Sequence, residues 1–198
     1  MKEIKKYHNN GQINIHTHHD DNQKTHGEYK TWYENGQLRQ YAHYVNGKLH
    51  GVCKEWYSNG TLESHRYYAD GQRHGEYRTW YPNGQLHQYA HYKNGKLHGE
   101  YRWWHRNGNE HERITYTDGK LNGEYKRWYD NGQLYVHTHY VDDKRHGEYK
   151  IWHYDGEINQ HTFWLHDKEV TEQVDKLITD VYNMTEEERI LIKLAIGC

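Results

Sequence analysis

Polar and apolar residues along this chain repeat with a period of 24, and each repeat holds two segments in which the two kinds of side chain alternate. The best copies share the consensus H-G-E-Y-K-x-W-Y-x-N-G-Q-L-x-x-x-x-x-Y-x-N-G-K-L. Alternation with a period of two is typical of β-strands. Asn-Gly between such segments indicates a tight hairpin turn. Each repeat therefore predicts two antiparallel strands, and successive repeats join into a meander.

Pairing across Asn35-Gly36 assigns the residues of a repeat to two faces of the sheet. It sets Tyr33 opposite Leu38, Thr31 opposite Gln40, Tyr29 opposite Ala42 and Gly27 opposite Tyr44. This first face is composed of Tyr, Leu, Ala and Gly. The second face is charged and rich in His, and it carries Glu28, Lys30, Trp32, Arg39, Tyr41, His43, Lys48 and His50.

Two features of the repeat keep alternative interpretations. A two-residue turn at Asn46-Gly47 would shear the sheet by two residues per repeat, whereas a four-residue loop over 46–49 would remove the shear. The Gly of each His-Gly pair either lies beneath an aromatic ring or forms a bulge with positive φ.

The repeats predict the following organisation. A partial repeat occupies 1–25, full repeats occupy 26–145, and a last repeat occupies 146–168. We expect about 13 strands in an elongated single-layer antiparallel sheet. Apolar spacing from Val170 onward and a capping box at 185–188 predict two α-helices over 169–198. These helices would cap the open edge of the sheet, or alternatively form a homodimer or recruit a partner.

Composition supports a thin structure that relies on aromatic side chains. Hydrophobic residues make up 33% of the 198 residues, but 15% are aromatic and 21 are Tyr. The net charge is −2 with acidic and basic residues interspersed, which argues against a nucleic-acid partner. Full protonation of the 20 His would take the charge to +18. Acidification would then change the solubility and contacts of the protein, or alternatively the His are half-exposed strand residues without a role in pH sensing.

The two cysteines and the absence of targeting signals bear on location. Cys53 and Cys198 do not form a disulfide framework, which favours a reducing compartment. The first residues lack the apolar stretch of a signal peptide, and no run of 18 apolar residues occurs. We therefore expect an intracellular, cytoplasmic protein.

The segment Tyr44–Gly51 and its copies resemble MORN repeats, in the variant 24-residue class that includes antitoxin-like proteins. The resemblance covers about residues 7–168. The standard Tyr-x-Gly-x-Trp segment is absent, and Tyr29 and Tyr77 stand where a standard repeat has a second Gly. Variant repeats followed by a helical tail also resemble repeat proteins of giant DNA viruses, which would place the chain in host cytoplasm. The resemblance implies an elongated sheet with scaffolding or recognition roles and, in some members, attachment to membrane phospholipid.

Histidine pairs raise the question of a metal site. His16, His18 and His19 lie close together, and His137 and His139 lie about 7 Å apart on one strand face. Two His and a carboxylate can bind Zn²⁺ or Ni²⁺. The His of successive His-Gly pairs, however, lie about 10 Å apart, too far for shared coordination. We therefore expect neither a dedicated metal site nor another cofactor.

Catalysis finds no support in the sequence, which has no phosphate-binding loop, H-E-x-x-H or G-x-S-x-G motif. Carboxylates recur at repeat-equivalent positions, and equal environments do not separate the pKa values of an acid and a base. The recurring carboxylates are Glu28, Glu76, Glu100, Glu124 and Glu148. We predict a non-enzymatic protein.

Six Trp recur on the charged face and form the main candidate for a binding surface. As a binding surface the Trp anchor a protein partner. As a structural feature each Trp packs over a cross-strand neighbour, such as Trp32 on Arg39. The expected partner-binding residues are Trp32, Trp56, Trp80, Trp104, Trp128, Trp152, His43, His91 and His139. The predicted function is a scaffold for protein–protein interaction, and the alternative is a peripheral module that binds membrane phospholipid.

Overall fold

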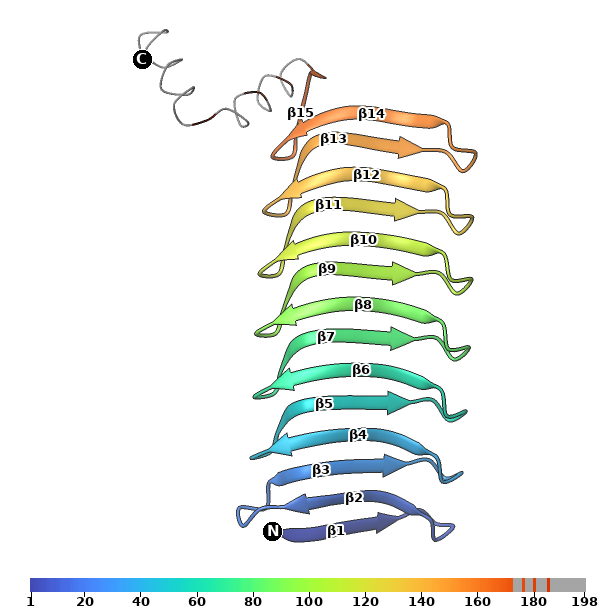
Figure 1. The fold of residues 1–198 in the computed structure, drawn as a ribbon, viewed down its shortest axis with the longest axis vertical. Helices are drawn as coiled ribbons and strands as arrows, with labels where there is room; N and C mark the ends of the chain where they lie inside the picture. Colours follow the sequence, from blue (N-terminus) through green and yellow to red (C-terminus); the bar gives the residue numbers. More distant parts are fainter. Residues whose placement is uncertain (173–175, 177–179, 181–184, 186–198) are drawn as a thin grey trace.

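The structure is a computed structural model that describes residues 1–172, 176, 180 and 185. Fifteen strands lie side by side in chain order in one open antiparallel sheet (Figure 1). They are β1 (Lys2–Tyr7), β2 (Ile13–His19), β3 (Thr25–Trp32), β4 (Leu38–Val45), β5 (Lys48–Trp56), β6 (Leu62–Ala69), β7 (Gln72–Trp80), β8 (Leu86–Lys93), β9 (Lys96–Trp104), β10 (Glu110–Thr117), β11 (Lys120–Trp128), β12 (Leu134–Val141), β13 (Lys144–Trp152), β14 (Ile158–Leu165) and β15 (Lys168–Val170).

The expected fold class is wrong in two respects. The sheet has fifteen strands rather than about 13, because the polar segment of β1 and the short β15 also pair with their neighbours. Every element with bounds in the described residues is a strand, so the described fold is an open antiparallel sheet and the two predicted C-terminal helices are not shown. The predicted helices, and dimerisation through them, lie almost entirely outside the described residues.

Equivalent residues of successive repeats lie in line across the sheet. Tyr29 pairs with Ala42, and Ala42 pairs with Cys53, which is the residue 24 positions after Tyr29. The same relation continues from Tyr77 through Ala90 to Tyr101. The strands are therefore not sheared from repeat to repeat, and each repeat position forms a straight column.

The core of this single layer is one such column. It mostly alternates a Tyr in one strand with a small or branched side chain in the next. Tyr rings pack edge-to-face beside the small residue, as Tyr29 does with Tyr44 at 5.6 Å between ring centroids. Burial raises the pKa of Tyr101 to about 12. The most buried residues of the column are Thr17, Ala42, Cys53, Ala90, Ile114 and Thr138.

A two-residue turn joins each repeat to the next. Asn46 and Gly47 both have positive φ, 52° and 81°, and Val45 pairs with Lys48. The shear expected from such a turn is absent because a bulge follows at Gly51, where φ is 82° and the register shifts. A Cβ on Gly51 would meet nothing within 4 Å, so the positive-φ interpretation is confirmed there and the ring-over-glycine interpretation is wrong.

The turn within each repeat is a three-residue loop despite its similar Asn-Gly sequence. The Tyr33 amide donates to the Gln37 carbonyl at 2.9 Å, and of Asn35 and Gly36 only the glycine has positive φ. Trp32 therefore pairs with Leu38, which corrects the expected pairing of Tyr33 with Leu38. The other three pairings expected across this turn are confirmed.

This register shift moves Leu38 to the side of Trp32 and Arg39 to the opposite side, because one extra residue reverses the alternation of side chains. The Arg39 guanidinium lies over the Tyr33 ring, 5.7 Å from its centroid, so Arg39 belongs to the tyrosine side and not beside Trp32. In the third repeat Leu86, the counterpart of Leu38, lines a hollow together with Trp80. The predicted packing of Trp32 on Arg39 is therefore wrong.

Candidate functional site: the tryptophan face

The six repeated Trp occupy one column on one side of the sheet, which we call the Trp face. Each is the last residue of its strand in β3, β5, β7, β9, β11 and β13. All six are half-buried. Because the repeats are not sheared, neighbouring Trp in the column are about 10 Å apart, twice the spacing between strands.

The three predicted histidines lie on the same face but in a different column. His43, His91 and His139 pair with the Glu that follows each bulge glycine, as His43 does with Glu28. Trp32 lies four residues further along the same strand as Glu28. All nine predicted partner-binding residues thus share one face, with the Trp at one end of the strands and the His nearer the other.

Charged side chains on the Trp face neutralise one another within single strands. Lys30 Nζ lies 2.6 Å from a Glu28 carboxylate oxygen, and Arg102 Nη2 lies 2.6 Å from Glu100. Similar pairs occur at Glu76–Arg78, Glu124–Lys126 and Glu148–Lys150. The hydrogen bond from Lys30 lowers the pKa of Glu28 below its usual value. The face therefore presents aromatic rings between paired charges and not a basic surface.

A hollow of about 540 Å³ lies between two consecutive Trp of the column. It is lined by Trp80 and Trp104, together with Leu86 and Tyr89. Charged groups complete the lining, namely Arg78, Glu100 and Arg102. The sequence did not indicate Leu86, because its face depends on the bulge after the three-residue loop.

The backbone of the Trp column has a structural task. Four of the six Trp are followed by a Tyr whose hydroxyl donates to the Trp carbonyl one repeat further on, as Tyr33 does to Trp56 at 2.7 Å and Tyr81 to Trp104 at 2.8 Å. In the first unit the His8 ring nitrogen donates to the Trp32 carbonyl at 2.9 Å. These bonds use the main chain of the Trp, so the indole rings stay available for other contacts.

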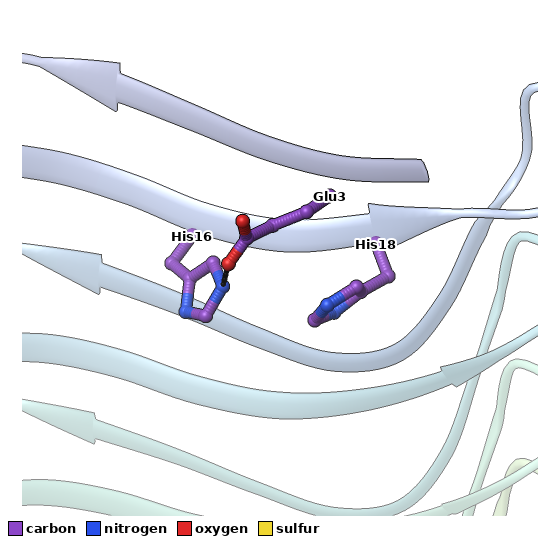
Figure 2. Close-up of side chains that lie close together, drawn as sticks. All are labelled: Glu3, His16 and His18. Carbon is purple, nitrogen blue, oxygen red and sulfur yellow. Dashed lines mark hydrogen bonds and ion pairs between the residues drawn. The ribbon is translucent and has the colours of Figure 1, made fainter. Parts of the chain in front are cut away.

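Two clusters on this face hold side chains that can ligate a metal ion: Glu3, His16 and His18, and Glu124, His137 and His139. Within each cluster the candidate ligand atoms all lie within 4.8 Å of one another. Figure 2 shows the Glu3 carboxylate reaching from β1 toward His16, with the His18 ring on its other side. Burial lowers the pKa of His139, and the hydrogen bond from Lys126 lowers the pKa of Glu124.

A single open sheet with in-line columns and one aromatic, charge-paired face defines a β-meander repeat protein. The sequence profile of the MORN repeat variant family matches residues 25–46, 49–72, 73–94, 97–120 and 121–142, more than half of the chain, so the chain belongs to this family. Among curated proteins none matches the chain. MORN repeats are non-catalytic modules of protein and membrane interaction. Within the described residues no helix is long and apolar enough to cross a membrane.

Proposed function

We propose that this chain is a non-enzymatic scaffold that binds a protein partner through the Trp face. The observation that carries the proposal is the hollow between Trp80 and Trp104, which is lined by apolar and aromatic surface and flanked by charges. Aromatic and Arg side chains around a recess are typical of the anchor regions of protein interfaces. The in-line columns repeat the Trp position along the sheet, so an extended partner would meet a Trp at regular intervals.

The alternative, a peripheral module for membrane phospholipid, is less well supported by the charges. Binding to an anionic surface is driven by an excess of Lys and Arg on the contacting face. Here five cations of the Trp face are paired with Glu at 2.6–3.0 Å. The Trp face thus offers little net positive charge to a lipid headgroup.

The test is capture of partners from extracts of the native cell by the full chain and by two variants. The Trp80→Ala/Trp104→Ala double variant removes both walls of the hollow, and we expect it to lose the partners that the wild-type chain retains. The matched control is Trp103→Ala. Trp103 neighbours Trp104 but packs on the opposite face, with its ring 4.3 Å from that of His111.

The outcomes distinguish a partner interface on the Trp face from an effect on folding and from phospholipid binding. Recovery of the same partners by the double variant would show that the Trp face is not the interface. Equal loss with Trp103→Ala would indicate a general effect on folding. Co-sedimentation with anionic liposomes, weakened by salt, would favour the phospholipid alternative.

A further inference from the structure

The tripeptide His-Thr-His occurs in two strands that are far apart in the chain, β2 and β12. In both copies the Thr is directed to the tyrosine side and buried, with Thr17 at 3% and Thr138 at 1% exposure. Alternation then places both His of each copy on the Trp face. The ring centroids are 5.3 Å apart for His16 and His18, and 5.5 Å apart for residues 137 and 139.

A carboxylate from the preceding strand completes each histidine pair. Glu3 pairs across the strands with His18, and Glu124 pairs with His139. Each carboxylate reaches diagonally to the other histidine. Glu3 Oε1 lies 2.8 Å from His16 Nε2, and the equivalent distance in the second cluster is 3.1 Å. The same three repeat positions therefore converge twice, in the hairpins β1–β2 and β11–β12.

We propose that these two hairpins are binding sites for a divalent first-row transition metal ion, with Zn²⁺ as the reference ligand. Each ion would be held by two imidazole nitrogens and one carboxylate oxygen, a donor set that suits Zn²⁺, with water in the remaining position. Ligand atoms around tetrahedral Zn²⁺ lie about 3.3 Å apart. The candidate ligand atoms now lie within 4.8 Å of one another, so binding requires them to approach by about 1.5 Å at most.

The sequence indicates both histidine pairs but places no particular carboxylate beside either, and the expectation of no dedicated metal site rests on the wide spacing of the His-Gly histidines. Glu3 precedes the first His-Gly repeat and lies outside the recognised period. Its place opposite His18 follows only from the pairing of β1 with β2. The structure thus supplies the third ligand at both hairpins.

A lysine in the same strand competes with the ion for each carboxylate. Lys5 Nζ lies 2.8 Å from Glu3 Oε1, and Lys126 Nζ lies 2.6 Å from Glu124 Oε1. A bound ion must displace this ammonium group from the carboxylate, and the positive charge of the lysine then remains close to the positive ion. Lys126→Gln should therefore tighten Zn²⁺ binding at the second hairpin, by about fivefold for one charge removed in a solvated environment.

The chain provides its own incomplete version of the site in the hairpin β13–β14. Glu148 and His161 keep the carboxylate–imidazole contact, at 2.9 Å, but Phe163 occupies the position of the second histidine. In the hairpin β7–β8 the second histidine is kept as His91, and Tyr89 occupies the position of the first histidine. Either hairpin has one imidazole fewer and should bind Zn²⁺ much more weakly.

The experiment is a Zn²⁺ titration of the full chain, without an affinity tag and after removal of metal by a chelator, followed by calorimetry. We expect two ions per chain. His18→Phe and His139→Phe, which copy the incomplete hairpin, should each remove one ion, and the double variant should remove both. His91→Phe is the control and should leave the stoichiometry at two.

Several results would overturn the proposal. These are fewer than two ions bound to the full chain, two ions retained by the double variant, or an equal loss with His91→Phe. Glu124→Gln provides a second test, because it keeps the shape of the side chain. It should weaken the site in the second hairpin at least tenfold while the circular dichroism spectrum stays unchanged. Weaker binding by Lys126→Gln would contradict the role of the carboxylate.

Discussion

Four Tyr hydroxyl groups donate to a Trp carbonyl in the next repeat, and this ladder makes a quantitative prediction. Tyr57 donates to Trp80, and Tyr81 donates to Trp104, both at 2.8 Å. Replacing either Tyr by Phe removes the hydrogen bond and leaves a half-buried carbonyl without this donor. The expected loss in the free energy of unfolding is about 1–2 kcal/mol for each variant.

The two losses should add, because the hydroxyls have separate acceptors and lie in different repeats. Tyr57→Phe/Tyr81→Phe should therefore lose about 2–4 kcal/mol. At about 2–4 °C per kcal/mol for a chain of this size, thermal unfolding followed by circular dichroism resolves each step. Urea titration of the same variants measures the free energies directly.

Tyr154→Phe is the matched control for the ladder. Its hydroxyl donates to the exposed carboxylate of Asp130 at 3.1 Å, and the residue is 55% exposed. Because solvent readily replaces such a partner, this variant should unfold like the wild-type chain. The reasoning is refuted if the Tyr57 and Tyr81 variants are no less stable than the Tyr154 variant.

Three further predictions concern single residues. Burial, with the charges of His105 and Arg127, lowers the pKa of His111 to about 4, so only the unfolded chain takes up this proton between about pH 6.5 and 4. As the pH falls from about 6.5 to 4, the free energy of unfolding should therefore decrease by at most about 3 kcal/mol, and solvent screening makes the decrease smaller. His111→Phe should flatten the pH dependence of urea unfolding. Gly51→Ala should cost about 1–2 kcal/mol in the same assay because φ is 82° there, whereas Gly51→Asn should cost less. Cys53 is 1% exposed and burial raises its pKa, so mass spectrometry should find its peptide alkylated in urea but not in the native chain; rapid native labelling would contradict this.

The positions of most strands and the contents of the tyrosine core follow from the sequence. Alternation over 27–31 and 40–44 places Tyr29, Thr31 and Ala42 on one side of the sheet. The structure confirms that Tyr29 pairs with Ala42 and that Thr31 pairs with Gln40. This works because side-chain direction depends only on counting by two along an uninterrupted strand. The prediction holds until the count meets a bulge.

The two turns of a repeat show where local sequence stops being sufficient. Asn35 and Asn46 both precede Gly, but the Asn35 side chain accepts the Gln37 amide at 3.1 Å and donates to the Ser58 carbonyl in the next repeat at 3.0 Å. Asn46 instead adopts positive φ itself. The bond to the amide two residues on also accompanies the equivalent loop at Asn83, whose side-chain amide donates to Gln85 and not to the next repeat. The Asn-Gly dipeptide alone therefore does not distinguish the two kinds of turn.

The first strand, in contrast, was detectable. Glu3, Lys5 and Tyr7 stand at the repeat positions of Glu28, Lys30 and Trp32, and an Asn-Gly follows at the matching distance. The segment lacks the His-Gly pair, and this absence concealed it. Comparison of charge and aromatic positions, rather than of the glycines, would have revealed β1 and the carboxylate of the first metal-ligand cluster.

The second repeat indicates which face of the sheet is free to diverge. In the buried column Cys53 replaces the usual Tyr, and in the same repeat Arg66 replaces the usual small residue. Arg66 fills the vacated space, 2.6 Å from Glu55 and stacked over Tyr77 at 5.7 Å.

A loss of volume in one strand of the core is thus matched by a gain in its neighbour, as close packing requires. No such compensation is needed on the Trp face. One column of the Trp face is Glu in every repeat except the second, where it is Val52. The positions opposite this column hold His43, Tyr67, His91, Thr115, His139 and Phe163 in successive hairpins, from β3–β4 to β13–β14. The tyrosine side therefore constrains the fold, and the Trp face can acquire binding chemistry one residue at a time.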